Sequence, residues 1–254
     1  MPLYIIGLGL SDEHDISLKG LKIIRECDLV YFENYTGILQ EPQEKLEEFF
    51  QKKIRIANRK LVEESDEILD NAASCDVAFL VVGDSFSATT HYDLFMRARK
   101  KRVKTYVIHN TSIIDAIGET GLHLYKFGAI ASIPLPQKNF SPESFFDVLK
   151  KNQKNGFHTL LLLDMKPDDH KFLTIKESIN ILLKINKKRK EKIFTEKTLV
   201  VGCARIGSED GMIKSGIVKE VSKINFGKPP YCMVVPGALH FTEEEALKGL
   251  DDKL

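Results

Sequence analysis

The chain has 254 residues, of which 43% are hydrophobic and 29% are charged, which excludes a disordered or fibrous protein. Its 37 Lys and Arg residues balance 36 Asp and Glu residues, so no global field holds it on nucleic acid or on an anionic membrane, and we expect neither as a direct partner. The length exceeds what one hydrophobic core needs, and we expect two α/β domains.

The amino-terminal sequence, the length of the apolar runs and the cysteines predict a cytoplasmic protein. No basic segment precedes the apolar run at residues 3–6, and no apolar run reaches membrane-spanning length. The cysteines are far apart and form no C-x-x-C pair, which predicts reduced, mostly buried thiols. The seven histidines are scattered singly, so we expect no metal site.

The first half of the chain alternates short apolar runs with amphipathic segments. Helix 41–53 is typical, because its Leu46, Phe49 and Phe50 share one face at three- and four-residue spacing. The alternation predicts a parallel sheet with right-handed crossovers. We expect strands over residues 3–9, 29–32, 54–57, 76–82 and 103–109, and helices over 17–27, 41–53, 63–73 and 91–101.

The pattern changes after residues 110–121, where the connections become longer and more varied. We therefore divide the chain into domains 1–112 and 113–254. The basic clusters 97–104 and 184–192 are typical of solvated helix faces and are also candidate contacts for a large partner. In the second domain we expect strands over 129–133, 158–163, 199–204 and 232–235, a helix over 173–190, and turns at 134–136 and 166–169.

Gly7-Leu8-Gly9 follows the first strand and resembles part of a dinucleotide-binding fingerprint. Glycines in such a loop let the backbone approach a pyrophosphate. Asp12 stands where the third glycine belongs, which removes the close helix contact and places a carboxylate at the phosphate position. The sequence therefore disfavours NAD or FAD and favours a structural turn.

Two strand ends carry small and polar residues that suit a ligand. Residues 83–91, Gly-Asp-Ser-Phe-Ser-Ala-Thr-Thr-His, follow the clearest strand, and in open α/β sheets ligands bind at the carboxyl ends of the strands. Asp84 accepts hydrogen bonds from a ligand or, alternatively, caps the next helix. Residues 109–112 follow another strand, where Thr111 or Ser112 is alternatively only an N-cap. The similar chemistry suggests one shared cleft.

With these pieces placed, the chain closely resembles the diphthine synthase family, within the tetrapyrrole methylase superfamily of S-adenosylmethionine-dependent methyltransferases. The resemblance covers almost the whole chain, and together its motifs are highly specific. The sequence departs from the family pattern at Ser85, where the family usually has proline, so we expect the loop over residues 83–91 to be less rigid than in its relatives. The segments that carry the resemblance are Tyr4-Ile5-Ile6-Gly7-Leu8-Gly9-Leu10, Asp15-Ile16-Ser17, Gly83-Asp84, Ala88-Thr89-Thr90-His91, Ile108-His109-Asn110, Gly121-Leu122-His123-Leu124-Tyr125-Lys126-Phe127-Gly128 and His158-Thr159-Leu160.

The resemblance implies two α/β domains of the tetrapyrrole methylase type, with S-adenosylmethionine in the interdomain cleft and usually a homodimer. Several of the implied contacts act through backbone groups. We assign no general base from the sequence. The implied cofactor contacts are Leu10, Asp84, Ser87, Ser112 and Ile113 in the first domain, and Leu163, Ile206 and Tyr231 in the second.

The implied activity is methylation of the modified histidine of translation elongation factor 2 in diphthamide biosynthesis. Segments 108–110 and 142–147 resemble eukaryotic members, which add four methyl groups and make a methyl ester, whereas the chain length resembles archaeal members, which add three. We favour the eukaryotic product. The alternatives are an archaeal-type trimethylating enzyme, a methylase of porphyrin-like rings or ribosomal RNA, and a noncatalytic protein that binds the elongation factor.

Overall fold

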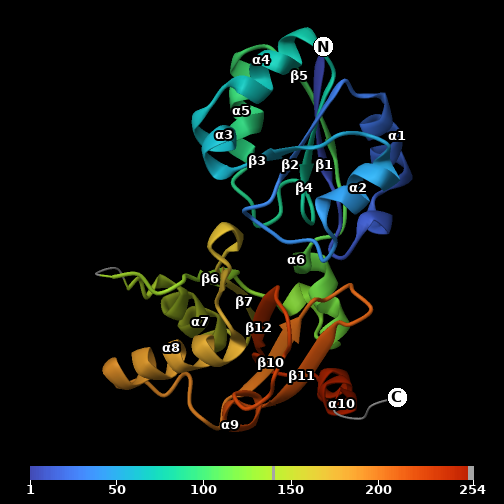
Figure 1. Cartoon of the computed structure of the whole chain (residues 1–254). Helices are drawn as coiled ribbons and strands as arrows, with labels where there is room; N and C mark the ends of the chain where they lie inside the picture. The colour runs from blue at the N-terminus through green and yellow to red at the C-terminus, as the bar shows by residue number, and fades with distance from the viewer. Residues whose placement is uncertain (139–140, 251–254) are drawn as a thin grey trace. The chain divides into compact units, whose positions relative to one another are not determined.

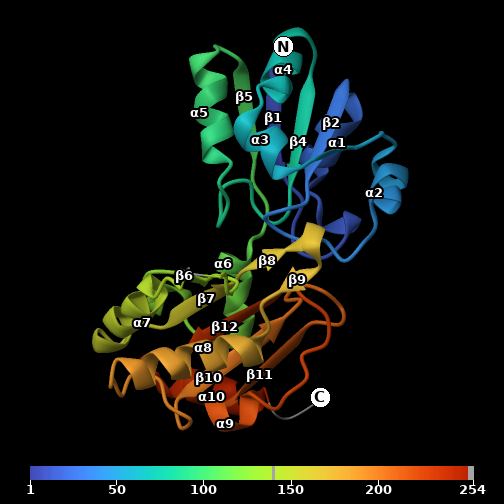
Figure 2. The same cartoon turned by 60° about the vertical axis from the view of Figure 1, so that its left-hand side comes forward.

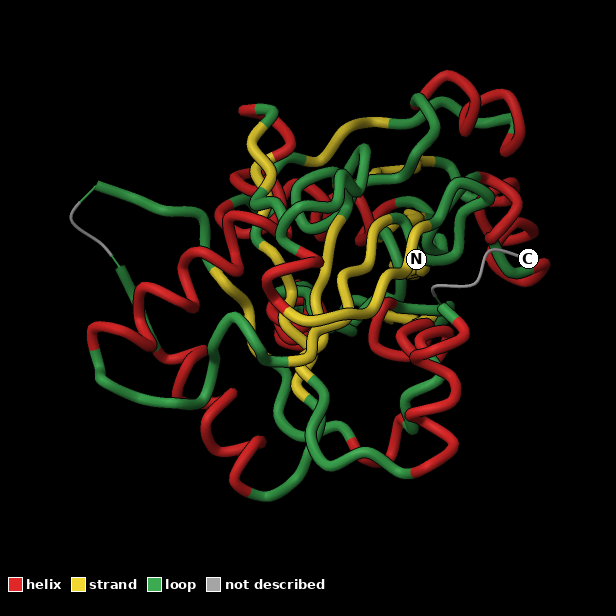
Figure 3. The backbone as a smooth tube through the Cα atoms, turned by 90° about the horizontal axis from the view of Figure 1, so that it is seen from below, coloured by secondary structure: helices red, strands yellow, loops and turns green. Residues whose placement is uncertain are grey.

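The computed structural model describes residues 1–138 and 141–250. It divides into two compact units, Met1–Ala116 (unit 1) and Ile117–Leu254 (unit 2), so the division lies after Ala116 rather than after residue 112. Helices and strands are distributed over both units and are joined by loops (Figure 3). Within the described ranges, no helix combines the length and the apolar composition that crossing a bilayer requires.

Unit 1 is a five-stranded parallel sheet with helices on both faces, as the alternating pattern predicts (Figure 1). The strand order is β3-β2-β4-β1-β5. The strands are β1 (Pro2–Gly7), β2 (Leu29–Glu33), β3 (Arg55–Ala57), β4 (Val77–Val81) and β5 (Lys104–Ile108). The helices are α1 (Leu18–Glu26), α2 (Gln43–Phe50), α3 (Arg59–Glu64), α4 (Glu67–Ser74), α5 (Tyr92–Lys100) and α6 (Ile113–Ala116), with a 3-10 turn η1 (Glu13–Asp15).

The sheet of unit 1 is buried on both faces. Helices α3, α4 and α5 cover one face and α1 and α2 the other (Figures 1 and 2). Ile5 and Phe79 belong to the core on the α3 to α5 side, whereas their chain neighbours Ile6 and Leu80 belong to the core beneath α1 and α2. Successive strand residues point to opposite faces, so burial on both sides requires the continuous apolar runs that the sequence shows.

One predicted helix of unit 1 is two helices. The sequence suggested a single helix over residues 63–73, but α3 ends at Glu64 and α4 begins at Glu67. Ser65 between them is extended, with φ −109° and ψ 152°, and its hydroxyl accepts a hydrogen bond from the N–H of Glu67. The guanidinium of Arg97 in α5 donates to the carbonyl of Ser65 at 2.8 Å. This long-range contact satisfies a carbonyl that a continuous helix would use internally, and no local pattern signals it.

Unit 2 is a mixed five-stranded sheet of order β11-β10-β12-β7-β6, in which only the β6–β7 pair is parallel. The four predicted strands are present. The strands are β6 (Ala131–Ile133), β7 (Thr159–Leu163), β10 (Leu199–Ala204), β11 (Met212–Ile217) and β12 (Tyr231–Val235), and a small hairpin pairs β8 (Met165–Lys166) with β9 (Lys171–Phe172) around η4 (Pro167–Asp169). The helices are α7 (Ser144–Lys154), α8 (Ile175–Lys188), α9 (Val218–Val221) and α10 (Phe241–Gly249), with 3-10 turns η2 (Ile117–Thr120) and η3 (Leu124–Lys126).

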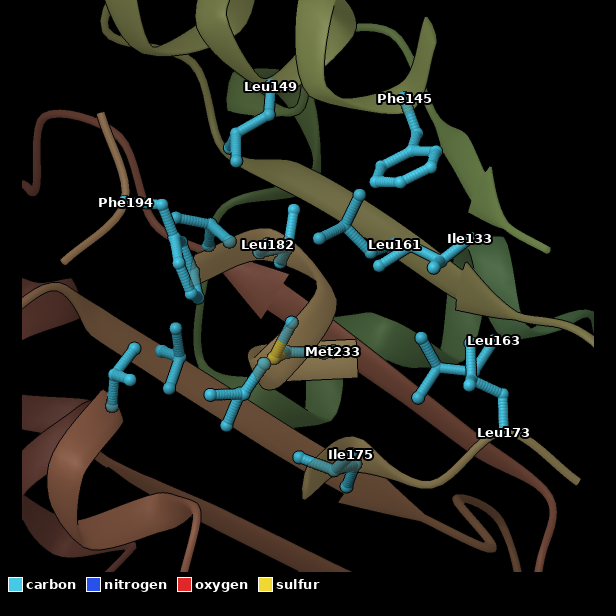
Figure 4. Packing of buried hydrophobic residues seen from close by; sticks show 14 of the residues in the cluster. Ile133, Phe145, Leu149, Leu161, Leu163, Leu173, Ile175, Leu182, Phe194 and Met233 are labelled. Carbon is cyan, nitrogen blue, oxygen red and sulfur yellow. The ribbon is translucent and has the colours of Figure 1, made fainter. Parts of the chain in front are cut away.

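The main core of unit 2 lies between the sheet and helices α7 and α8. Figure 4 shows Phe145 and Leu149 of α7 and Leu182 of α8 pointing toward Leu161 and Met233 of the sheet. These five side chains are almost wholly buried. The removal of apolar surface from water is the dominant favourable term in folding. The amphipathic pattern that predicted a helix over residues 173–190 is therefore the pattern of a face packed on this core.

The elements of unit 2 that the sequence did not predict are α7, α9, α10, the hairpin strands β8 and β9, and edge strand β11. Edge strand β11 is half-buried along its whole length, so it lacks the apolar alternation that marks a strand. Helix α10 buries only Glu243 and Leu247, so it lacks an apolar stripe. Both elements are fixed by tertiary contacts, and for α10 the contact is a buried charge.

Glu243 fixes the amino end of α10. Its Oε1 accepts from the N–H of His123 and from Nε2 of His158, both at 2.9 Å. Its Oε2 accepts from the N–H of His240 at 2.7 Å and from Lys126 Nζ. Burial alone would raise the pKa of Glu243, but Lys126 and these donors lower it to about 2. The carboxylate therefore stays charged inside the protein because four donors replace water.

We expect Glu243→Gln to lower the free energy of unfolding at pH 7 by about 1–3 kcal/mol, because an amide cannot accept from all four donors. A carboxyl group with a lowered pKa stabilises the fold above its unfolded pKa, and this stability is lost as the pH falls through the folded pKa. The difference between wild type and variant should therefore shrink between pH 4.5 and about 2. Urea unfolding at several pH values measures it.

The matched control is Glu244→Gln, which changes an exposed carboxylate on the same helix. It should leave the unfolding free energy within about 0.5 kcal/mol of wild type. Equal stability of the Glu243→Gln variant and wild type at pH 7 would contradict the role of the buried charge.

Candidate functional site

The carboxyl ends of β4, β1 and β5 are adjacent in the sheet of unit 1, and the loops that follow them meet. The N–H of Gly9 donates to the carbonyl of Gly83 at 3.2 Å, and the N–H of Gly83 donates to the carbonyl of Gly9 at 2.7 Å. The loop after β1 and the loop after β4 are therefore joined backbone to backbone. This edge is where open parallel sheets bind ligands.

Gly7 and Gly9 allow this close approach. A Cβ on Gly7 would lie 2.5 Å from the carbonyl oxygen of Gly83, and Gly9 has φ +87°, with Asp15 packed against it. Asp12, which stands where a dinucleotide-binding loop has glycine, caps η1 by accepting from the N–H of His14 at 2.8 Å. These contacts give Gly7-Leu8-Gly9 the structural role that the sequence favoured over NAD or FAD binding.

Asp84 ties the loop after β4 to the loop after β5. Its Oδ1 accepts from the N–H of Phe86 at 3.0 Å and from Ser87 Oγ at 3.1 Å, and its Oδ2 accepts from Nδ1 of His109 at 2.8 Å and from the N–H of Asn110 at 3.2 Å. Burial alone would raise the pKa of Asp84, but these donors lower it below its ordinary value. The alternative that Asp84 caps the next helix is wrong, because α5 begins eight residues later.

Asn110 and Asp15 complete the loop contacts. The side-chain amide of Asn110 donates to the carbonyls of Gly7 at 3.1 Å and of Asp15 at 3.0 Å. Asp15 Oδ2 accepts from the N–H groups of Leu10 and Ser11 at 2.9 and 2.8 Å. Sequence reasoning assigned neither residue a role, although both lie in segments that carry the family resemblance. Leu10 is thus placed at the edge by a carboxylate five residues away.

The serines of these loops have separate roles. Ser87 donates to Asp84, and Ser112 accepts from the N–H of Ile114 at 3.1 Å, so the N-cap alternative applies to Ser112, and Ile113 opens α6. Ser85, the residue that stands in place of the usual proline, is fully buried. Its hydroxyl lies 3.3 Å from the carbonyls of Ile5 and Ile108 and so anchors the loop to a strand end.

A buried acid and a buried imidazole lie at the end of β2. Glu33 accepts from the N–H groups of Tyr35 and Thr36 at 3.1 and 3.0 Å, and burial, which would raise its pKa, is outweighed by His91 and Thr36, which lower it. His91, the last residue of the 83–91 loop, has Nε2 3.5 Å from Glu33 Oε1. Neither ring nitrogen of His91 has a hydrogen-bond partner. Sequence reasoning missed this pair.

The three predicted site residues of unit 2 lie at one edge of its sheet. Tyr231 at the start of β12 is opposite Ala204 at the end of β10, and Leu163 ends β7, the other neighbour of β12. Ile206 follows β10 by two residues, and both it and Leu163 are buried. The hydroxyl of the half-buried Tyr231 donates to the carbonyl of Gly227.

Arg205 organises the loops at this edge of unit 2. Its guanidinium is buried and donates to the carbonyls of Phe226 at 2.9 Å and of Asp210 at 2.8 Å, and to Asp210 Oδ2 at 2.8 Å. It therefore ties the segment that carries Ile206 to the segment that precedes Tyr231. The fixed fork of donors on arginine suits several carbonyls at once, which a lysine could not match.

One turn gathers three residues of metal-ligating type. Candidate ligand atoms of Asp12, Glu13 and His14 all lie within 4.8 Å of one another. His14 Nδ1 is 3.4 Å from Asp12 and 3.5 Å from Glu13, and Lys45 Nζ is 3.3 Å from Glu13. Within the described residues these contacts account for the turn as a cap and an ion-pair group.

Comparisons with known proteins agree over nearly the whole chain. The family model of tetrapyrrole (corrin/porphyrin) methylases matches residues 2–221. The chain is 44% identical to a diphthine synthase from Methanococcus maripaludis, covering 99% of this chain and all of the relative. It is 44% identical to a diphthine methyl ester synthase from Bos taurus, covering 96% and 93%. A crystal structure of diphthine synthase matches with TM-score 0.90 at 38% identity, covering 98% of this chain and 96% of the other.

We expect Gly7→Ala to destabilise the protein by several kcal/mol. The new Cβ would lie 2.5 Å from the carbonyl oxygen of Gly83, and two backbone hydrogen bonds to Gly9 hold Gly83 in place. Thermal and urea unfolding measure the effect. Gly249→Ala is the control, since a Cβ there has nothing within 4 Å and alanine favours the helix. A Gly7→Ala variant as stable as wild type would show that the two loops separate easily.

Proposed function

Because the chain belongs to the tetrapyrrole (corrin/porphyrin) methylase family, we propose that it methylates the modified histidine of translation elongation factor 2, with S-adenosylmethionine as methyl donor, in diphthamide biosynthesis. The observation that carries the proposal is 44% identity over almost the full length to a diphthine synthase and to a diphthine methyl ester synthase. The chain is a methyltransferase of this type. The family model by itself also fits methylation of a porphyrin-like ring, but these two full-length relatives favour elongation factor 2.

The charge at the sheet edge of unit 1 fits this cofactor. Asp84 and Glu33 are buried carboxylates with lowered pKa values, so both are charged at neutral pH. Negative charge in a poorly solvated site attracts a sulfonium cation and repels a pyrophosphate. These features support S-adenosylmethionine over a dinucleotide.

The proposal assigns the cofactor contacts residue by residue. In unit 1, Asp84 shapes the loop, because its oxygens already accept four protein donors, and Ser87 keeps lone pairs for a ligand. In unit 2, Arg205 performs the shaping role. The proposed contacts are Leu10, Asp84, Ser87, Ser112 and Ile113 of unit 1 and Leu163, Ile206 and Tyr231 of unit 2.

The chemistry requires an unprotonated amine. The cofactor, when bound, supplies an electrophilic methyl group. The protein residues bind and orient the two reactants and exclude water from them. An alkyl ammonium has a pKa near 10.4, so the enzyme binds the minority neutral amine or removes a proton first. We assign no described residue as that proton acceptor. Positioning and electrostatics then carry the acceleration.

We further propose the methyl ester product, a cytoplasmic location with the translation machinery, and a homodimer. Relatives of both product types match at 44% identity, so identity does not separate three methyl groups from four. The eukaryotic likeness of segments 108–110 and 142–147 supports the ester. Mass spectrometry of the modified factor counts the methyl groups, and sedimentation measures the number of chains.

Labelled S-adenosylmethionine tests the activity. The protein is incubated with it and with elongation factor 2 that carries the modified histidine before methylation. Label should appear on that histidine and increase with the amount of enzyme. A protein that binds the factor without transferring label would be the noncatalytic binder, and label on ribosomal RNA or on a tetrapyrrole alone would also overturn the proposal.

We expect Asp84→Asn to weaken S-adenosylmethionine binding by about tenfold, because it removes a buried negative charge and one acceptor of the loop. Titration calorimetry measures the affinity, and thermal unfolding reports any general loss of stability. Asp93→Asn is the control, since Asp93 is an exposed carboxylate that pairs with Arg97. Unchanged cofactor affinity in Asp84→Asn would contradict the assignment.

A further inference from the structure

Four rings form one continuous row on the surface of unit 2. The ring centroids of Tyr125 and His123 are 5.2 Å apart, those of His123 and His240 are 5.6 Å apart, and those of His240 and Phe241 are 4.3 Å apart. Tyr125 is 82% exposed and Phe241 is 65% exposed. We call these four residues the ring row. Leu124, which is 46% exposed, lies between two of its members in the sequence.

The ring row is held from beneath by Glu243. The carboxylate accepts from the N–H groups of His123 and His240, and so clamps the two segments that carry the rings against each other. Lys126, at the end of η3, donates to Glu243 and also to the carbonyl of Ala238 at 2.7 Å. A fully satisfied buried network of this kind is rigid. The backbones of the two segments that carry the rings therefore have fixed positions, which lowers the entropy that a partner must remove on binding.

The fold does not explain the exposure of these rings. An exposed side chain removes little apolar surface from water, so Tyr125 and Phe241 contribute little to stability. Single exposed apolar residues are common, but contiguous exposed apolar groups mark interaction sites. Tyrosine is also enriched among the residues that dominate binding energy at protein interfaces.

The charge around the ring row favours a basic partner. Glu244 and Glu245 are exposed and follow Phe241 by three and four residues in α10, which places them on its side of the helix, and within the described residues neither forms an ion pair. Lys126 is already neutralised by Glu243, and Lys248 lies in the last turn of α10. The faces of aromatic rings attract cations, and the planar guanidinium of arginine stacks on them. Rings and free carboxylates together select cationic side chains.

We propose that the ring row, with Glu244 and Glu245, docks a basic surface of the folded protein substrate. This inference rests on the proposed function, because an enzyme that modifies one side chain of a folded protein uses contacts away from the reacting centre. The substrate surface presents arginine or lysine side chains to the rings and to the two carboxylates. The segment Gly121 to Gly128, which contributed to the family resemblance, then has a role in substrate recognition.

Direct binding tests the proposal without methyl transfer. Elongation factor 2 is titrated against wild type and against Tyr125→Ala and Phe241→Ala. Each truncation should weaken binding about tenfold, the cost of losing an anchor residue. Tyr125→Phe keeps the ring and should bind like wild type. Leu18→Ala, which truncates an exposed apolar side chain in unit 1, is the matched control and should also bind like wild type.

A charge reversal tests the basic character of the partner. The double variant Glu244→Lys, Glu245→Lys should weaken binding at low salt, and the difference from wild type should shrink as salt screens exposed charges. In methyl transfer, all of the weakened variants should raise KM for the elongation factor and leave kcat and cofactor affinity unchanged. Thermal unfolding confirms that each variant is folded.

Three outcomes would overturn the proposal. In the first, both ring truncations bind the elongation factor as tightly as wild type does. In the second, wild type does not bind the factor. In the third, the ring truncations bind the factor with full affinity and convert a wild-type dimer to monomers. The last outcome would make the row an interface between two copies. Wild type that binds the factor through the row but transfers no methyl group would overturn the proposed function and leave the docking surface intact.

Discussion

A carboxylate removed from water must be matched by hydrogen-bond donors, and three buried carboxylates impose this constraint on both units. Asp84 and Glu243 each accept four donors, and Glu33 accepts two backbone N–H groups and a hydroxyl. In each case most of the donors are main-chain groups or side chains of irregular segments. The shapes of the strand-end loops therefore depend on these charges.

The same charges connect structure to function in unit 1. A parallel sheet brings its strand ends to one edge but does not determine what the loops there look like. Asp84 joins the loops after β4 and β5, and Asn110 joins both to the loop after β1. The result is a compact edge with negative charge, which supports the cationic cofactor that we propose.

Unit 2 contains both a buried cation and a buried anion, and each must be matched by hydrogen-bond partners. Arg205, a buried cation, is matched by carbonyl oxygens and by Asp210, and its contacts shape the edge that carries Ile206 and Tyr231. Glu243, a buried anion, is matched by N–H donors and joins the two segments that carry the exposed ring row. A buried charge therefore organises both the sheet edge that carries the proposed site residues of unit 2 and the exposed ring row.

The sequence by itself determined most of the strands, the parallel sheet of unit 1 and the strand ends where the expected site residues lie, because burial on one or two faces leaves a period in the apolar residues. Resemblance to a family, not periodicity, supplied the cofactor and the substrate. Only the tertiary structure decided the break at Ser65, the edge strand β11, helix α10, and the partners of Asp84 and Glu243. Those features depend on contacts between residues far apart in the chain, such as Glu243 with His123, and a contact of that kind leaves no local periodicity to detect.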